Sequence, residues 1–163
     1  RVPEVCALEV YRLGCGGALL GVGVCRDLMV AQALQGELLF ASAGCASCHV
    51  PELTTGAGHP FGELREQTIR PFTDLLLHDM GPGLADNMAD GDAGAAEWRT
   101  PPLWSLGLSA AVSGGEAYLH DGRARTIAEA ILWHGGEGEA AKEAFRTMVA
   151  ADRAALVVFL QSL

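Results

Sequence analysis

Basic residues are scarce in this sequence of 163 residues. Lys and Arg together number 11 against 20 Asp and Glu, which gives a formal net charge of -9 at pH 7. Nucleic-acid binding needs a basic face that neutralises phosphates, so this class of function is excluded. No apolar run reaches the roughly 20 residues of a membrane-spanning helix. The acidic balance instead suits a basic protein partner, which the field of the chain would steer towards it.

Aromatic residues are also few, at 6%, whereas glycine is abundant at 21 residues. No strand-rich region and no internal repeat is present, and the apolar residues recur at helical spacing. We expect a helix from near Ala31 to Gly44, with an inward stripe formed by Leu34, Leu38, Phe40 and Ala41. The apolar run Leu75 to Leu77 looks buried.

The C-terminal part has the clearest helix signals. Thr126 followed by Glu129 predicts a capping box, and the helix after it places Ile127, Ala130, Ile131 and His134 on one face before Gly135-Gly136 ends it. A second helix is expected near 140–150, with Phe145 and Met148 inward. The last helix is predicted to begin at Asp152 as N-cap, with the stripe Leu156, Phe159, Leu160 and Leu163. These patterns predict an all-α fold with long loops, and such loops need a central group to organise them.

The five cysteines fall into two groups. Cys6, Cys15 and Cys25 lie near the N-terminus and are odd in number, so they cannot all pair within the chain. We expect residues 1–30 to be a leader without an assigned role and residues 31–163 to be the functional domain.

The other two cysteines belong to the stretch "GCASCH", in which His49 directly follows Cys45-Ala46-Ser47-Cys48. C-x-x-C-H is the attachment signature of c-type haem. Two thiols one helical turn apart can form thioethers with the two haem vinyl groups, and the next residue then lies beneath the iron. A zinc site needs four ligands at matching spacing, and a thioredoxin-like dithiol needs a βαβ context. Neither context is evident, so the motif favours one covalently bound haem c with His49 as proximal ligand.

The ligand on the other side of the iron is harder to identify, because haem iron in cytochromes takes Met or His there. The candidates are Met80, Met88, Met148, His59, His78, His120 and His134. Met148 suits core packing, whereas His59 and Met88 lie in solvated loops. From the pattern alone, His134 and Met80 are about equally good candidates for the second iron ligand.

Several stretches together resemble one known family. They are "FASAGCASCHVPEL", "FTDLLLHDMGPGLAD", "EWRTPPLWSLGL", "YLHDGRARTIAEAILWHGGEG" and "VVFLQSL". From about Gln35 to Leu163 the chain is similar to the C-terminal haem domain of the bacterial di-haem oxidoreductases. These peroxidase-like proteins are also called thiol oxidoreductase-like, and they are distantly similar to the di-haem cytochrome c peroxidases. The resemblance implies a cytochrome c-like domain, with short helices and long loops wrapped around the haem.

The family carries two haems on two C-x-x-C-H sites, so the resemblance implies a second haem domain as partner of this one. In the related peroxidases the distal ligand follows the His of an "HDG" triplet by fourteen residues, which leads from His120 to His134. Ligation of the iron by His49 and His134 would follow. The C-terminal haem of those enzymes transfers electrons, so the implied role is an electron relay. The alternative is a self-contained haem peroxidase with an open distal site.

Further residues are candidates for contacts around the haem. Arg123 and Arg125 can pair with haem propionates, and His120 can bond a propionate or the backbone. Related peroxidases bind calcium between domains, but Asp86, Asp90 and Asp92 do not follow the EF-hand spacing. Attachment of haem c requires export, so we expect a periplasmic or outer-surface location and an electron-donor protein there.

Overall fold

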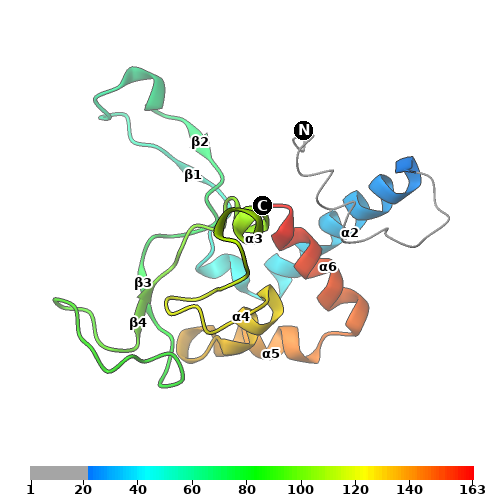
Figure 1. Ribbon diagram of the computed structural model, residues 1–163. Coiled ribbons are helices and arrows are strands. Elements are labelled where there is room, and N and C mark those ends of the chain that lie inside the picture. The colour runs from blue at the N-terminus through cyan, green and yellow to red at the C-terminus, as the bar shows by residue number, and fades with distance from the viewer. Residues whose placement is uncertain (1–21) are drawn as a thin grey trace.

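This computed structural model describes residues 22–163, and the side chains of residues 27–163. Helices provide most of the regular structure in this part of the chain (Figure 1). The α-helices of this part are α2 (Val22–Ser42), α3 (Ser109–Ser113), α4 (Ile127–Trp133), α5 (Glu139–Thr147) and α6 (Ala150–Gln161). Short 3-10 turns are η1 (Cys45–Ser47), η2 (Gly62–Leu64), η3 (Leu106–Leu108) and η4 (Gly136–Gly138). A mostly helical fold is therefore confirmed. Within these residues no helix is both long and apolar enough to cross a membrane.

Helix α2 begins at Val22, earlier than expected, and crosses α6 at Gly36. A Cβ atom at Gly36 would lie 2.6 Å from Cβ of Phe159 and would collide with the carbonyl oxygen of Ala155. Because only glycine permits this close crossing, the inward face of α2 is Gly36, Phe40 and Ala43. The predicted stripe is wrong apart from Phe40, since Leu34 and Leu38 are 59% and 68% exposed and Ala41 is exposed too.

The core lies where α2, α4, α5 and α6 meet. Its buried members are Phe40, Phe72, Ile127, Phe145, Leu156, Phe159 and Leu160. The rings of Phe40, Phe72 and Phe159 pack edge to face, with centroids 5.4–5.9 Å apart. The ring of His49 lies next to this trio, 6.4 Å from that of Phe40. The aromatic part of the core therefore supports the segment that follows the C-x-x-C-H motif.

The C-terminal helices follow the predictions closely. Phe145 is buried at 2% exposure, and Met148 packs against the core. Leu156, Phe159 and Leu160 are buried as expected, with Leu163 packed against them. The predicted N-cap is wrong, however, because α6 begins at Ala150 after Val149 and Asp152 lies in its first turn.

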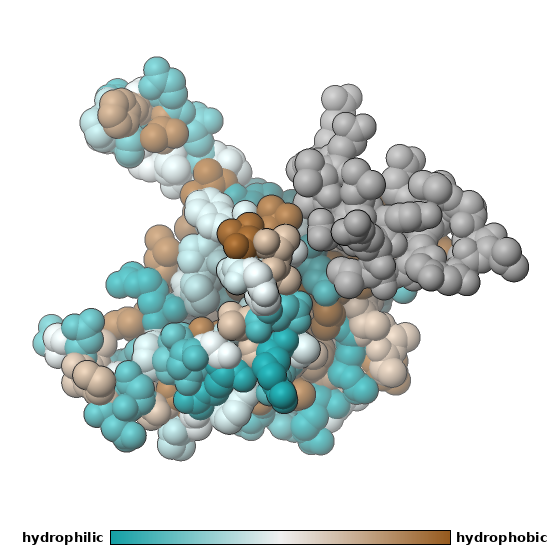
Figure 2. Space-filling model, viewed as in Figure 1, coloured by the Kyte–Doolittle hydropathy of each residue, from teal (hydrophilic) through white to brown (hydrophobic). Residues whose placement is uncertain are grey.

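Two small antiparallel sheets interrupt the helical fold. Strands β1 (Leu53–Thr54) and β2 (Thr68–Ile69) form the base of a hairpin that projects from the body. Exposed apolar residues, Phe61 and Leu64, lie in its loop, and Figure 2 shows apolar surface at its end. Strands β3 (Leu77–Asp79) and β4 (Glu97–Arg99) pair beside the helices, with His78 opposite Trp98.

The apolar run before β3 departs from its expected burial. Leu75, Leu76 and Leu77 are 44–60% exposed. The segment lies beside β4 and not in the interior of the protein. The carbonyl oxygens of Leu75 and Leu76 accept hydrogen bonds from Arg99 and Thr100. The run is therefore held by its backbone rather than by its side chains.

Candidate haem-binding site

The C-x-x-C-H segment forms a single helical turn. Gly44 lies between α2 and this turn and has a φ of 85°, a left-handed conformation that glycine adopts without strain. The amides of Cys48 and His49 then both donate to the carbonyl oxygen of Cys45, the latter at 3.0 Å. The expected placing of the two thiols one turn apart is thus present, and neither thiol is in a disulfide.

Both thiols are protonated at neutral pH. Burial raises the pKa of Cys45 to about 11, and it also raises the pKa of Cys48. Reactive dithiols of the thioredoxin kind instead depend on a lowered thiol pKa. No strand–helix–strand unit surrounds the motif in residues 22–163 either. The surroundings therefore disfavour a redox dithiol.

His49 is oriented by the main chain of a distant segment. Its Nδ1 lies 3.1 Å from the carbonyl oxygen of Phe72, which can only accept a hydrogen bond. Nδ1 therefore carries the proton, and Nε2 keeps a free lone pair. Burial lowers the pKa of His49 to about 4, although the bond to Phe72 opposes this shift. The imidazole is consequently neutral at pH 7, which is the form that binds metals.

His134 is presented in the same way. It is the C-cap residue of α4, and its Nδ1 donates to the carbonyl oxygen of Ala130 at 2.9 Å. Burial lowers its pKa as well. The rings of His134 and His49 lie next to each other, with centroids 6.4 Å apart and planes inclined by 52°. Two neutral imidazoles, each with a free Nε2, are thus brought together from sequence positions far apart.

The helix that carries His134 is fixed at its start by the predicted cap. The hydroxyl of Thr126 accepts a hydrogen bond from the amide of Glu129 at 3.0 Å, and the carboxylate of Glu129 accepts one from the amide of Arg125 at 3.0 Å. Ile127 on the same helix is buried, and Ile131 packs against the core. The predicted inward face, ending at His134, is therefore present.

Met80, the competing candidate, lies beside His134. The Met80 methyl group and the His134 ring both lie 3.2 Å from the position that a Cβ atom of Gly138 would occupy. The other candidates lie elsewhere or serve other contacts. Met88 is 72% exposed, His59 bonds Phe61 in the loop of the projecting hairpin, and Met148 packs on the core.

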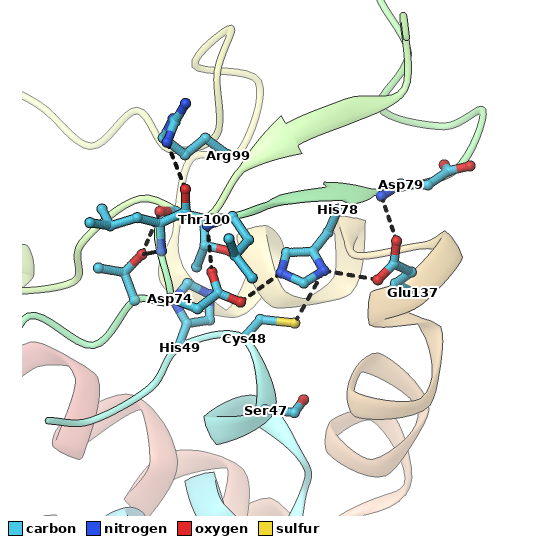
Figure 3. Close-up of polar contacts among 12 residues, drawn as sticks. Ser47, Cys48, His49, Asp74, His78, Asp79, Arg99, Thr100 and Glu137 are labelled. Atoms are coloured by element: carbon cyan, nitrogen blue, oxygen red, sulfur yellow. Dashed lines mark hydrogen bonds and ion pairs between the residues drawn. The ribbon is translucent and has the colours of Figure 1, made fainter. Parts of the chain in front are cut away.

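His78 stands at the centre of a polar network that sequence reasoning missed (Figure 3). Its Nε2 lies 2.8 Å from a carboxylate oxygen of Asp74, and its Nδ1 lies 2.8 Å from one of Glu137. The Cys48 sulfur is 3.8 Å from the same Nδ1. Only the Asp74–His78 spacing of four residues hinted at this contact. The approach of Glu137, 59 residues further on, had no local signal.

The hydrogen bonds of this network shift the pKa values of its members towards their charged forms. The hydrogen bond to Glu137, and then that to Asp74, raises the pKa of His78. The bond from His78 and the amide of Asp79 lower the pKa of Glu137. Burial alone would raise the pKa of Asp74, but its bonds to Leu76 and His78 lower it. The two carboxylates therefore favour the protonated form of His78.

The same network brings three metal-ligating side chains together. Single atoms of Cys48, Asp74 and His78 lie within 4.8 Å of one another, and this is the one such group found in the described part of the chain. A structural zinc site is closed by four ligands. Both ring nitrogens of His78 already face carboxylates. The set is therefore incomplete as a zinc site.

The remaining predicted residues make contacts within the protein. The ring of His120 stacks on that of Trp98, with centroids 3.6 Å apart and planes 9° from parallel. Arg123 bonds the carboxylate of Asp121 and the carbonyl oxygen of Gly83, both at 2.6 Å. Its guanidinium also lies 4.9 Å from the ring centroid of Trp133, the residue before His134. Arg123 thus connects the end of α4 to the segments that contain Asp121 and Gly83.

Arg125, a candidate for a propionate contact, and the acidic loop both face the solvent. Arg125 has a side chain 83% exposed and lies 3.5 Å from Glu129. In the acidic loop, Asp86, Asp90 and Asp92 are exposed.

Comparison with known proteins identifies one relationship. Residues 17–163 match the family model described as "Di-haem oxidoreductase, putative peroxidase". The match begins earlier than the resemblance noted from about Gln35, and it includes the C-x-x-C-H turn and both neighbouring histidines. No curated protein and no solved structure matches the chain.

Proposed function

Because the chain belongs to the di-haem oxidoreductase family, we propose that residues 31–163 form a c-type cytochrome domain that relays electrons within a peroxidase-like oxidoreductase. In this proposal Cys45 and Cys48 hold one haem c by thioethers, with His49 and His134 as its axial ligands. The mostly helical fold then corresponds to a cytochrome c-like domain, whose long loops surround the haem.

The neighbouring imidazoles of His49 and His134 carry the proposal. A bond of about 2 Å from each imidazole to one metal, on opposite sides, holds the ring centroids roughly 6 Å apart. The separation of 6.4 Å between His49 and His134 fits this arrangement. Each Nδ1 also donates to a main-chain carbonyl, the outer contact that orients metal-binding histidines and leaves Nε2 as ligand.

The residues determine what such a site can do. A bound haem supplies an iron that exchanges one electron at a time. As a ligand, His134 would occupy the position that peroxide needs, so the site would favour electron transfer over peroxide cleavage. Two neutral imidazoles set a lower potential than a His/Met pair, since methionine ligation raises it. Trp133, 38% exposed and adjacent to His134, lies at the surface where electrons would enter or leave.

The family name implies a second haem, whereas this sequence contains one C-x-x-C-H motif. We infer that the partner of this domain is a second haem domain, where peroxide chemistry would occur. The net charge of -9 suits a basic electron-donor protein. Covalent attachment of haem c implies export to the periplasm or outer surface.

The spectrum of the protein produced with a c-type haem maturation system tests this proposal. We expect one covalently attached haem per chain and a low-spin ferric spectrum without the charge-transfer band of methionine–iron bonds. A high-spin spectrum with rapid reaction towards peroxide would instead establish the self-contained peroxidase. A chain that binds stoichiometric zinc and no haem under the same conditions would refute both.

A further inference from the structure

One segment, residues 72–81, contacts the surroundings of both histidines, and we call it the strap. At its beginning, the carbonyl oxygen of Phe72 accepts the Nδ1 hydrogen of His49, and the amide of Thr73 donates to Val50 at 3.0 Å. The Thr73 hydroxyl, fully buried, donates to the carbonyl oxygen of Thr100 at 2.7 Å. The beginning of the strap is therefore fixed to the His49 side.

The end of the strap lies against the turn that follows His134. A Cβ atom at Gly81 would lie 2.9 Å from the amide nitrogen of Gly136, and one at Gly135 would lie 2.8 Å from the carbonyl oxygen of Met80. Gly81 and Gly136 have φ angles of 76° and 51°. Glycines thus permit two main-chain segments to meet here without side chains between them.

His78 links the two ends. Glu137, in the turn after His134, accepts from His78 and, at 2.9 Å, from the amide of Asp79. On the other ring nitrogen His78 bonds Asp74, whose carboxylate also accepts from the amide of Leu76 at 2.9 Å. The His134 turn is therefore tied, through one imidazole, to the part of the strap that holds His49 (Figure 3).

We propose that the strap sets the spacing of the two axial histidines, with His78 as its positioning residue and Glu137 as its contact on the His134 side. This inference rests on the proposed haem ligation. His78 would not touch the iron. It would keep the turn after α4 in place, so that His134 stays bound when a competing ligand is present.

Two observations indicate that this contact serves the site in addition to its contribution to the stability of the fold. His78, Asp74 and Glu137 lie outside the buried core cluster, and the Glu137 side chain is 56% exposed. The strap also contains strained backbone, with φ of 54° at Phe72 and 62° at Leu75. Such conformations in residues with side chains cost energy and persist where the surroundings enforce them. At Phe72 the strained residue is the one that orients His49.

The test measures how easily His134 leaves the iron in haem-loaded protein. Cyanide binds ferric iron in this site only after His134 has moved away. In Glu137→Gln and His78→Gln we expect cyanide to bind at least tenfold faster than in the wild type, with a larger high-spin fraction. Matched controls are Glu143→Gln and His59→Gln. Glu143 pairs with Arg146 in α5, and His59 lies in the projecting hairpin, so both should behave as wild type.

The possible results separate the two proposals. Unchanged cyanide binding in both strap variants, with haem attached and His134 confirmed as ligand, would refute the strap. Faster binding in the controls as well, or lowered unfolding midpoints that match the gain in rate, would show a general loosening and would also refute it. A wild type without covalent haem, or a His134→Ala variant with an unaltered spectrum, would overturn the ligation itself and with it the role of the strap.

Discussion

The rings of His49 and His134 are neighbours with centroids 6.4 Å apart, and each donates its Nδ1 hydrogen to a main-chain carbonyl. Because both histidines make the same Nδ1 hydrogen bond, the pair differs from two histidines that only pack together. A packed pair has no need to leave both Nε2 atoms free. Here each Nδ1 bonds a main-chain carbonyl, a contact that commonly orients metal-binding histidines.

The first prediction concerns His134. Replacing it by alanine should open one side of the iron, give a high-spin ferric spectrum and produce a peroxide reaction that the wild type lacks. His134→Met should stay low-spin with a higher midpoint potential, because methionine ligation raises the potential of haem iron. Optical spectra and a redox titration measure both effects.

Met80 supplies the control for this prediction, because its methyl group lies beside the His134 ring. Met80→Leu should keep the wild-type spectrum. If His134→Ala stayed low-spin and the double variant with Met80→Leu became high-spin, then Met80 would be the ligand in place of His134.

A second prediction concerns the cap of the helix that carries His134. Thr126→Ala removes the hydrogen bond to the amide of Glu129 and should lower the free energy of unfolding by about 1 kcal/mol. Thr126→Ser keeps the hydroxyl and should lose much less. Denaturant unfolding of the haem-loaded protein measures both values. Equal losses in the two variants would show that the methyl group of Thr126, rather than its cap, stabilises α4.

Local signals account for what could be predicted from the sequence. The C-x-x-C-H turn is closed by bonds among neighbouring residues, and α4 is capped by Thr126 and Glu129, three residues apart. Helix α6 was assigned its inward face correctly because its apolar residues recur at helical spacing. The choice of His134 over Met80 needed the family resemblance, since both residues end an apolar segment.

Contacts between distant segments account for what could not be predicted. The inward face of α2 depends on its crossing with α6 at Gly36, and nothing in the α2 sequence indicates which side meets Ala155. The bond between His78 and Glu137 joins residues 59 positions apart. Leu75 to Leu77 looked buried because they are apolar, yet their main chain is what holds them.

A third prediction tests the crossing of α2 and α6. Gly36→Ala places a Cβ atom against the carbonyl oxygen of Ala155, a main-chain atom that cannot move aside alone. The helices must separate, so the free energy of unfolding should fall by about 1–3 kcal/mol, despite the better helix propensity of alanine. Gly58→Ala is the control, because nothing lies within 4 Å of its added Cβ atom. Equal stability of the two variants would disprove a close crossing at Gly36.

A fourth prediction concerns the pH dependence of the strap. Bonds to Glu137 and Asp74 raise the pKa of His78 in the folded protein, so the folded state holds this proton more tightly than the unfolded state does. Its contribution to stability is therefore complete below the unfolded value of about 6.5 and is lost as pH rises through the folded pKa. Glu137 and Asp74 have lowered pKa values and stay ionised across this range, while Cys48, in the proposed thioether, would not titrate. Unfolding of the haem-loaded protein between pH 6 and 9 should show wild-type stability declining towards that of His78→Gln, and parallel curves for the two proteins would contradict the charged state assigned to His78.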